Sequence, residues 1–119
     1  MRYLLLIAEE EGKRAQWSEQ EQEADLAKWF AYTNDLQESG AFVDGVALNE
    51  SSMATTVRVT GGETLTTDGP FAETKEIING YYLIDVDNLD DAIACAAGIP
   101  TSGAVEVRPV LEFEMPDGA

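Results

Sequence analysis

Apolar and polar positions along the chain switch between the periods of strands and helices. Residues 2–8 form an apolar run of strand length, and a polar loop follows to Trp17. Ser18 and Glu21 then have the spacing of a capping box, and Gly40 is a stop signal. The inward stripe between these signals consists of Leu26, Trp29, Phe30, Thr33 and Leu36. The pattern predicts a strand and then a long helix.

The middle of the chain has strand periodicity. Residues 42–48 predict a strand, and residues 56–60 and 63–66 flank Gly61-Gly62, a two-residue signal for a tight hairpin. Residues 80–86 predict a further strand. This half of the chain therefore carries a hairpin between two sheet strands.

A second helix and a last strand complete the pattern. Asn88 is a helix cap, Gly98 and Pro100 end the helix, and residues 104–110 predict a strand. The order βαββαβ with an inserted β-hairpin predicts an α+β fold, the ferredoxin-like sandwich. We expect residues 1–110 to form a single domain and residues 111–119 a C-terminal arm or frayed end.

Two sheet strands are apolar on both faces. Side chains alternate across a strand, yet residues 3–7 and 81–86 carry large apolar groups at successive positions. Two helices cover one face, so the other face needs the inserted hairpin, a second subunit, or both. A monomer with the hairpin folded over the sheet is the alternative to a dimer.

Composition limits the classes of partner. Seven basic and 23 acidic residues give a net charge of -16, which argues against direct binding to nucleic acid. No apolar run has the length of a membrane span, and the first residues lack the pattern of a secretory signal, so we expect a cytoplasmic protein. The acidic runs, such as Glu9-Glu10-Glu11, are typical of a solvated surface, and adaptation to high salt is an alternative. Cys95 is predicted to be a small buried hydrophobe.

The last strand places two ionisable side chains on one face. Glu106 and Arg108 alternate with Val105 and Val107, so they are predicted to point toward the interface or cavity side. Arg2 shares that face by parity. Glu106, Arg108 and Arg2 are candidates for substrate binding, and an ion pair that fixes strand register, within the strand or across to a partner, is the slightly favoured alternative.

The segment from Thr67 to Glu76 combines turn residues, an apolar side chain and ionisable groups. Asp68-Gly69-Pro70 has strong turn chemistry, and Phe71 is predicted to anchor the loop in the core. Turn formation alone explains these residues. In a functional interpretation, Asp68 is a candidate general base. The candidate binding groups of this region are Glu73, Lys75 and Tyr81.

Metal and cofactor sites have no support in the sequence. There is no histidine and no cysteine pair, so zinc and most transition metals lack their usual ligands. Asp85, Asp87, Asp90 and Asp91 lack the glycine and distant glutamate of a calcium loop. We expect no metal and no cofactor.

The segment 67–76 resembles the signature of the DGPF subgroup of the YCII-related domain family, and residues 1–7, 80–86 and 104–109 are also similar. The resemblance implies a homodimer whose sheets meet as a dimeric α/β barrel. It also implies small lyases or isomerases that use a His and Asp pair, and a chain without histidine cannot carry that pair. Members of the subgroup are often encoded near extracytoplasmic-function sigma factors, which implies a link to such a pathway.

Two functions from different classes follow. The chain is either a lyase-like or isomerase-like enzyme that acts on a small anionic metabolite, with Asp68 as base and Arg108 and Arg2 as anion ligands, or a non-catalytic binding or regulatory module. The sequence leaves open whether it is an enzyme, and it does not identify a ligand.

Overall fold

The computed structural model describes residues 1–116 of the chain. Its elements are β1 (Arg2–Glu10), the 3-10 turn η1 (Arg14–Gln16), α1 (Glu19–Glu38), β2 (Phe42–Ala47), the 3-10 turn η2 (Ser51–Met53), β3 (Thr55–Thr60), β4 (Glu63–Asp68), β5 (Glu76–Asp85), α2 (Leu89–Ala97) and β6 (Ala104–Pro109). An antiparallel sheet has the order β2-β5-β1-β6, and β3 and β4 form a separate hairpin. The predicted α+β fold with two helices, four sheet strands and a hairpin is confirmed. The strand order is compatible with a ferredoxin-like arrangement.

Both predicted helix starts are confirmed. The Ser18 side chain accepts a hydrogen bond from the Glu21 backbone N–H at 3.1 Å, and the Ser18 N–H donates to the Glu21 carboxylate at 3.3 Å. The Asn88 side chain accepts from the Asp91 N–H at 2.9 Å. These bonds satisfy backbone donors that lack a partner in the first turn of a helix.

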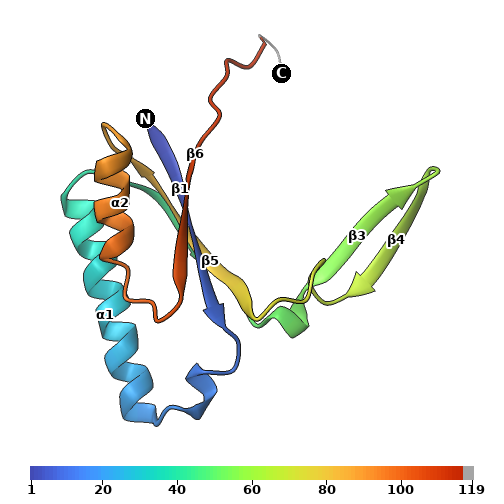
Figure 1. The fold of residues 1–119 in the computed structure, drawn as a ribbon, viewed down its shortest axis with the longest axis horizontal. Coiled ribbons are helices and arrows are strands. Elements are labelled where there is room, and N and C mark those ends of the chain that lie inside the picture. Colours follow the sequence, from blue (N-terminus) through green and yellow to red (C-terminus); the bar gives the residue numbers. More distant parts are fainter. Residues whose placement is uncertain (117–119) are drawn as a thin grey trace.

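The core lies between the helices and one face of the sheet. Both helices cover that face (Figure 1). The odd-numbered side chains of β1 point into it, and Leu5 in β1 and Ile84 in β5 are fully buried. The other buried core side chains are Tyr3, Ile7, Leu36, Ala41, Tyr82, Ala92 and Ile99. Cys95 packs partly buried against this core, as predicted.

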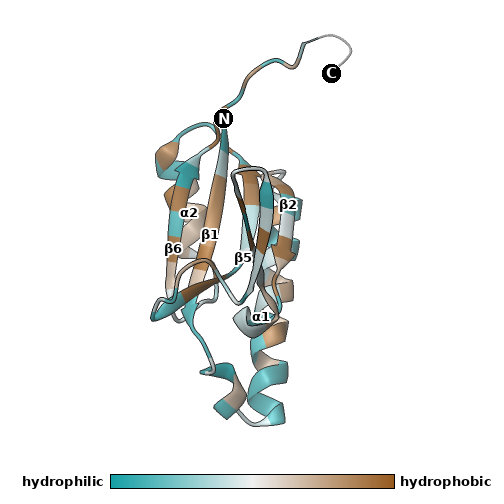
Figure 2. Ribbon diagram, turned by 90° about the vertical axis from the view of Figure 1, so that its right-hand side faces the viewer, coloured by the Kyte–Doolittle hydropathy of each residue, from teal (hydrophilic) through white to brown (hydrophobic). Residues whose placement is uncertain are grey.

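The opposite face of the sheet is not covered by any described element. We call it the open face. It contains Leu4 and Leu6 of β1, which lie opposite Leu83 and Tyr81 of β5. All four are half-buried, and Figure 2 looks onto this side, where the central strands are strongly hydrophobic.

The hairpin does not fold over the open face. It projects from the end of the sheet on the side away from the helices (Figure 1), so the monomeric alternative is not observed. Gly61 and Gly62 have φ values of 58° and 83°, the backbone that a tight hairpin turn requires. Val57 and Val59 are 58% and 69% exposed. The radius of gyration of 17.0 Å exceeds the roughly 13.5 Å of a compact chain of this length because of such projections.

The loop after the hairpin corrects one further expectation from the sequence. Phe71 is 79% exposed, so the prediction that it anchors the core is wrong; its loop follows the projecting hairpin and does not reach the core. Residues 111–116 form no helix or strand, and residues 117–119 of the predicted arm lie outside the described residues. No helix of the described chain is long and apolar enough to cross a membrane.

Candidate functional site

A cavity of about 730 Å³ lies between the amino-terminal half of α1 and the β2–β5 edge of the sheet. We call it the α1 cavity. Leu26 and Phe30 of α1 line it, and they are 52% and 66% exposed. Two residues of the predicted buried stripe are therefore cavity walls. Val46 and Leu48 line it on the β2 side, where Val46 is paired with Tyr81 at the edge of the sheet.

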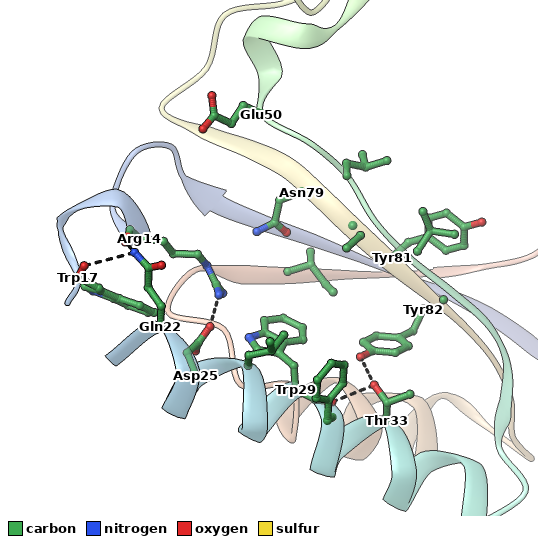
Figure 3. Close-up of a pocket in the computed structure, with 18 of the residues that line it drawn as sticks. Arg14, Trp17, Gln22, Asp25, Trp29, Thr33, Glu50, Asn79, Tyr81 and Tyr82 are labelled. Carbon is green, nitrogen blue, oxygen red and sulfur yellow. Dashed lines mark hydrogen bonds and ion pairs between the residues drawn. The ribbon is translucent and has the colours of Figure 1, made fainter. Parts of the chain in front are cut away.

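An ion-pair cluster stands at one end of the cavity. Arg14 donates from Nε to Glu9 Oε2 at 2.9 Å and from Nη2 to Glu9 Oε1 at 2.7 Å. Its Nη1 donates to Asp25 of α1 (Figure 3). Thr101, before β6, donates its hydroxyl to Glu9 Oε1 at 2.6 Å. The Glu9 carboxylate thus joins η1 and the segment before β6 to the end of β1, and Arg14 extends the link to α1.

The cluster corrects one expectation from the sequence. Glu9 was predicted to lie on a solvated surface, yet it is only 6% exposed. It is buried because it continues the inward parity of the buried residues on β1. Arg14 compensates its charge, and Thr101 donates a further hydrogen bond to it. Glu10, its neighbour on the other face, is exposed as predicted.

Two indole rings flank the Arg14 guanidinium. Its Cζ atom lies 5.4 Å from the ring centroid of Trp17 and 5.4 Å from that of Trp29. This geometry is a double cation–π contact. The Nε1 of Trp29 is buried and has no hydrogen-bond partner among residues 1–116, while both rings line the α1 cavity.

The charges of the cluster are fixed near neutral pH. Burial by itself raises the pKa of Glu9, but hydrogen bonds from Arg14 and Thr101 and the charge of Arg14 bring that pKa below its usual value. The hydrogen bonds to Glu9 raise the pKa of Arg14 against the effect of burial. Both groups therefore stay ionised, and neither exchanges protons near pH 7.

A hydroxyl pair lies further along the cavity. The Tyr82 and Thr33 hydroxyl oxygens are 2.6 Å apart, and Thr33 also donates to the Trp29 carbonyl at 2.9 Å (Figure 3). Tyr82 is buried on the helix side of β5. The side chain of Tyr81 lies on the open face, where its hydroxyl donates to Asp44 at 3.3 Å.

The cationic candidates from the sequence lie away from this cavity. Arg108 and Glu106 are opposite Leu4 and Leu6 on the open face, as their parity predicted, and both are exposed. Arg2 is at the same face and approaches Glu112 at 3.6 Å. No ion pair joins Glu106 to Arg108 within residues 1–116.

The candidates of the signature segment are also dispersed. Asp68 is exposed at the end of β4, and it lines neither the α1 cavity nor the smaller cavity described next. Lys75 lines a hollow of about 290 Å³ together with Lys13, Glu10 and Glu76. Glu73 is exposed in the preceding loop. The structure does not bring these residues together with Arg108 or Arg2.

The sequence interpretation missed Glu9, Arg14 and Asp25 as a group. One signal was available, because a carboxylate at an inward position of a central strand requires a positive partner. Trp29, a member of the predicted inward stripe, packs against Arg14 and lines the cavity, and Trp17 does the same from the preceding loop. No group of three potential metal ligands occurs in the described part of the chain.

The chain is similar in sequence to a known protein family and to a protein of a known bacterium. The model of the YCII-related domain family matches residues 1–114. An uncharacterized protein of Rhizobium meliloti (strain 1021) is 37% identical over 118 residues, which cover 96% of this chain and 95% of that protein. The similarity therefore extends over nearly the whole chain and brings no activity with it.

Proposed function

We propose that this chain, which belongs to the YCII-related domain family, is a small-molecule-binding protein whose ligand occupies the α1 cavity. The cavity itself carries this proposal. Its volume of about 730 Å³ is within the range of about 300–1,000 Å³ that is usual for small-molecule sites. Its walls are mainly apolar and aromatic, and its charged groups are few: Arg14 and Asp25 lie at one end, and Glu50 lies apart from them (Figure 3).

The ion pair at the end of the cavity favours binding over catalysis. A general acid or base near neutral pH needs a pKa close to that pH. Glu9 has a lowered pKa and Arg14 a raised one, and each is held by the other. Groups of this kind provide fixed charge and fixed geometry, which a recognition site requires.

A lyase-like or isomerase-like activity is the second candidate. Asp25 supports it, because it is the carboxylate of the ion-pair cluster that lines the cavity. Asp68, the base expected from the sequence, lies outside the cavity. In an enzyme, Asp25 would therefore be the base.

A thermal-shift screen with a set of uncharged, cationic and anionic metabolites tests the proposal, since a ligand that binds only the folded state raises Tm. Phe30→Ala removes an aromatic ring from the cavity wall at an exposed position, so the variant should fold. Phe71→Ala is the matched control, because Phe71 is exposed and lines neither cavity.

We expect the Tm shift of each hit to decrease in Phe30→Ala and to persist in Phe71→Ala. Hits that stabilise Phe30→Ala as strongly as the unmodified protein would contradict binding in the α1 cavity. Chemical conversion of a hit, lost in Asp25→Asn, would establish the enzymatic candidate.

We also propose that the chain is a ferredoxin-like member of the DGPF subgroup and forms a homodimer, the dimeric α/β barrel, through the open face. The segment Asp68-Gly69-Pro70-Phe71 supports the subgroup. The half-exposed leucines of β1 and β5 and the projecting hairpin on the same side support the pairing. A second sheet placed against the open face would cover these leucines.

Light scattering after size-exclusion chromatography tests the dimer. We expect a mass twice that of the 12.9-kDa chain. Leu6→Lys on the open face should reduce it to the mass of one chain, whereas Leu89→Lys at an exposed position of α2 should not. A single-chain mass of the unmodified protein at all concentrations would exclude the barrel.

A further inference from the structure

We infer that the ligand of the α1 cavity is an organic cation, an amine or ammonium group on an apolar body. This inference rests on the binding function proposed above and names the chemical class of its ligand. It replaces the anionic metabolite expected from the sequence. Four independent features of the cavity support it.

The first feature is the charge of the lining. The ionisable acids and bases that line the cavity with a formal charge at pH 7 are one guanidinium, Arg14, and two carboxylates, Asp25 and Glu50. Arg14 is already bound to Glu9 and Asp25. An arriving anion therefore meets no uncommitted positive charge, and it meets Glu50, which forms no ion pair within residues 1–116.

The second feature is the negative electrostatic field around the cavity. The chain has a net charge of -16, and α1 itself carries Glu19, Glu21 and Glu23 on its first turns. Such a field raises the local concentration of cations and lowers that of anions. The amino end of α1, which would favour an anion, is already capped by Ser18 and Glu21.

The third feature is the aromatic surface. Ring faces carry negative electrostatic potential and attract organic cations. The cavity already holds one such cation, the Arg14 guanidinium, between the rings of Trp17 and Trp29 (Figure 3). Phe30 and Tyr82 continue the aromatic wall beyond it.

The fourth feature is size. A volume of about 730 Å³ is far larger than an inorganic cation needs. Leu26, Phe30 and Leu48 are among the apolar residues that line the remainder, and contact with an apolar part of a ligand would remove their surface from water. The ligand is therefore a cation with a hydrocarbon or aromatic part.

A matched series of three probes tests the inference by isothermal titration calorimetry. The probes are 2-naphthylmethylamine, 2-naphthamide and 2-naphthoate, which share one ring system and are cationic, neutral and anionic at pH 7. We expect the amine to bind about tenfold more tightly than the amide at low salt, and the carboxylate to bind most weakly. The preference for the amine should decrease at high salt.

Two variants test whether the carboxylates of the cavity cause the preference for the amine over the amide. Glu50→Gln and Asp25→Asn should each weaken binding of the amine severalfold and leave the amide nearly unchanged. Glu63→Gln removes the same charge from the tip of the hairpin, outside the cavity, and should leave the preference intact. Glu50 is exposed and forms no ion pair within residues 1–116, so Glu50→Gln tests the charge of the cavity even if Asp25→Asn disturbs the ion-pair cluster.

Three results would overturn the inference. They are equal or tighter binding of the naphthoate, a preference that falls as much in Glu63→Gln as in Glu50→Gln, and no measurable binding of any probe. In the first two cases the probes still bind, so the binding function stands while the cation fails. In the third case the inference fails, and the thermal-shift screen with metabolites described above tests separately whether the cavity binds any small molecule.

Discussion

Glu9 and Arg14 form a two-point ion pair between the end of β1 and the turn η1, with nitrogen to oxygen distances of 2.7 and 2.9 Å. The pair fixes the loop that carries Trp17 against the sheet, and it holds the guanidinium at the end of the α1 cavity. A bidentate pair of this kind is strong because both partners are ionised and the planar groups match. The shape of the cavity end therefore depends on one carboxylate.

Replacement of Glu9 should change the pH dependence of stability. The pKa of Glu9 is lower in the folded protein than its reference value of 4.5, so the unfolded chain takes up a proton first as the pH falls. The stabilisation is fully present above about pH 4.5 and is lost as the pH falls through the lower folded pKa. In urea unfolding between pH 7 and pH 3.5, Glu9→Gln should lose less stability than the unmodified protein.

The size of the effect at pH 7 follows from burial. Glu9→Gln leaves Arg14 with a poorer acceptor and should lower the free energy of unfolding by about 1–3 kcal/mol. Glu63→Gln, at the hairpin tip, controls for the loss of one negative charge. Equal pH profiles for the unmodified protein and Glu9→Gln would contradict a role of this carboxylate in stability.

Arg14 should not be replaceable by lysine. The lysine ammonium cannot donate to Glu9 at two points and does not stack between two indole rings. We expect Arg14→Lys to lower the free energy of unfolding by about 1–2 kcal/mol. Both tryptophans of the chain contact Arg14, so their fluorescence emission should also shift. Arg58→Lys on the hairpin is the control, and a similar loss there would show a general effect of the substitution.

The local elements could be predicted from the sequence because their causes are local. The caps at Ser18 and Asn88 and the turn at Gly61-Gly62 each depend on residues within a few positions of one another. The two-sided apolar pattern of β1 also indicated correctly that two helices leave one sheet face uncovered. Such features follow from capping, turn geometry and strand parity.

The cavity could not be predicted in the same way. Glu9 is buried by contact with Thr101, which is 92 residues away, and no local pattern reveals that partner. Leu26 and Phe30 obey helical periodicity whether they pack in a core or line a cavity. The position of Phe71 depends on the direction of the hairpin, which tertiary contacts determine.

The hydroxyl pair of Thr33 and Tyr82 should behave as a coupled unit. Thr33→Val leaves the buried Tyr82 hydroxyl without its partner at 2.6 Å and should lower the free energy of unfolding by about 1–2 kcal/mol. Tyr82→Phe removes the other hydroxyl. The double variant should be less destabilised than the sum of the single variants, and urea unfolding of all four proteins measures the difference. Strict additivity would show that the two hydroxyls do not interact.

Gly103 should not tolerate a side chain, and the consequence should reach the cavity. A Cβ at Gly103 would lie 1.9 Å from the Ala8 carbonyl oxygen, so the backbone must move. The Gly103 N–H also donates to the Thr101 hydroxyl oxygen at 3.1 Å, and Thr101 donates to Glu9. We expect Gly103→Ala to lower the free energy of unfolding by about 1–3 kcal/mol and to reduce ligand binding in the α1 cavity.

Gly98→Ala is the matched control, because the atom nearest to its added Cβ would be 3.5 Å away and the Gly98 φ of -82° suits alanine. Chemical denaturation should therefore find Gly98→Ala within about 1 kcal/mol of the unmodified protein. Equal stability of the two variants would show that the contact between β1 and the start of β6 is looser than the structure indicates.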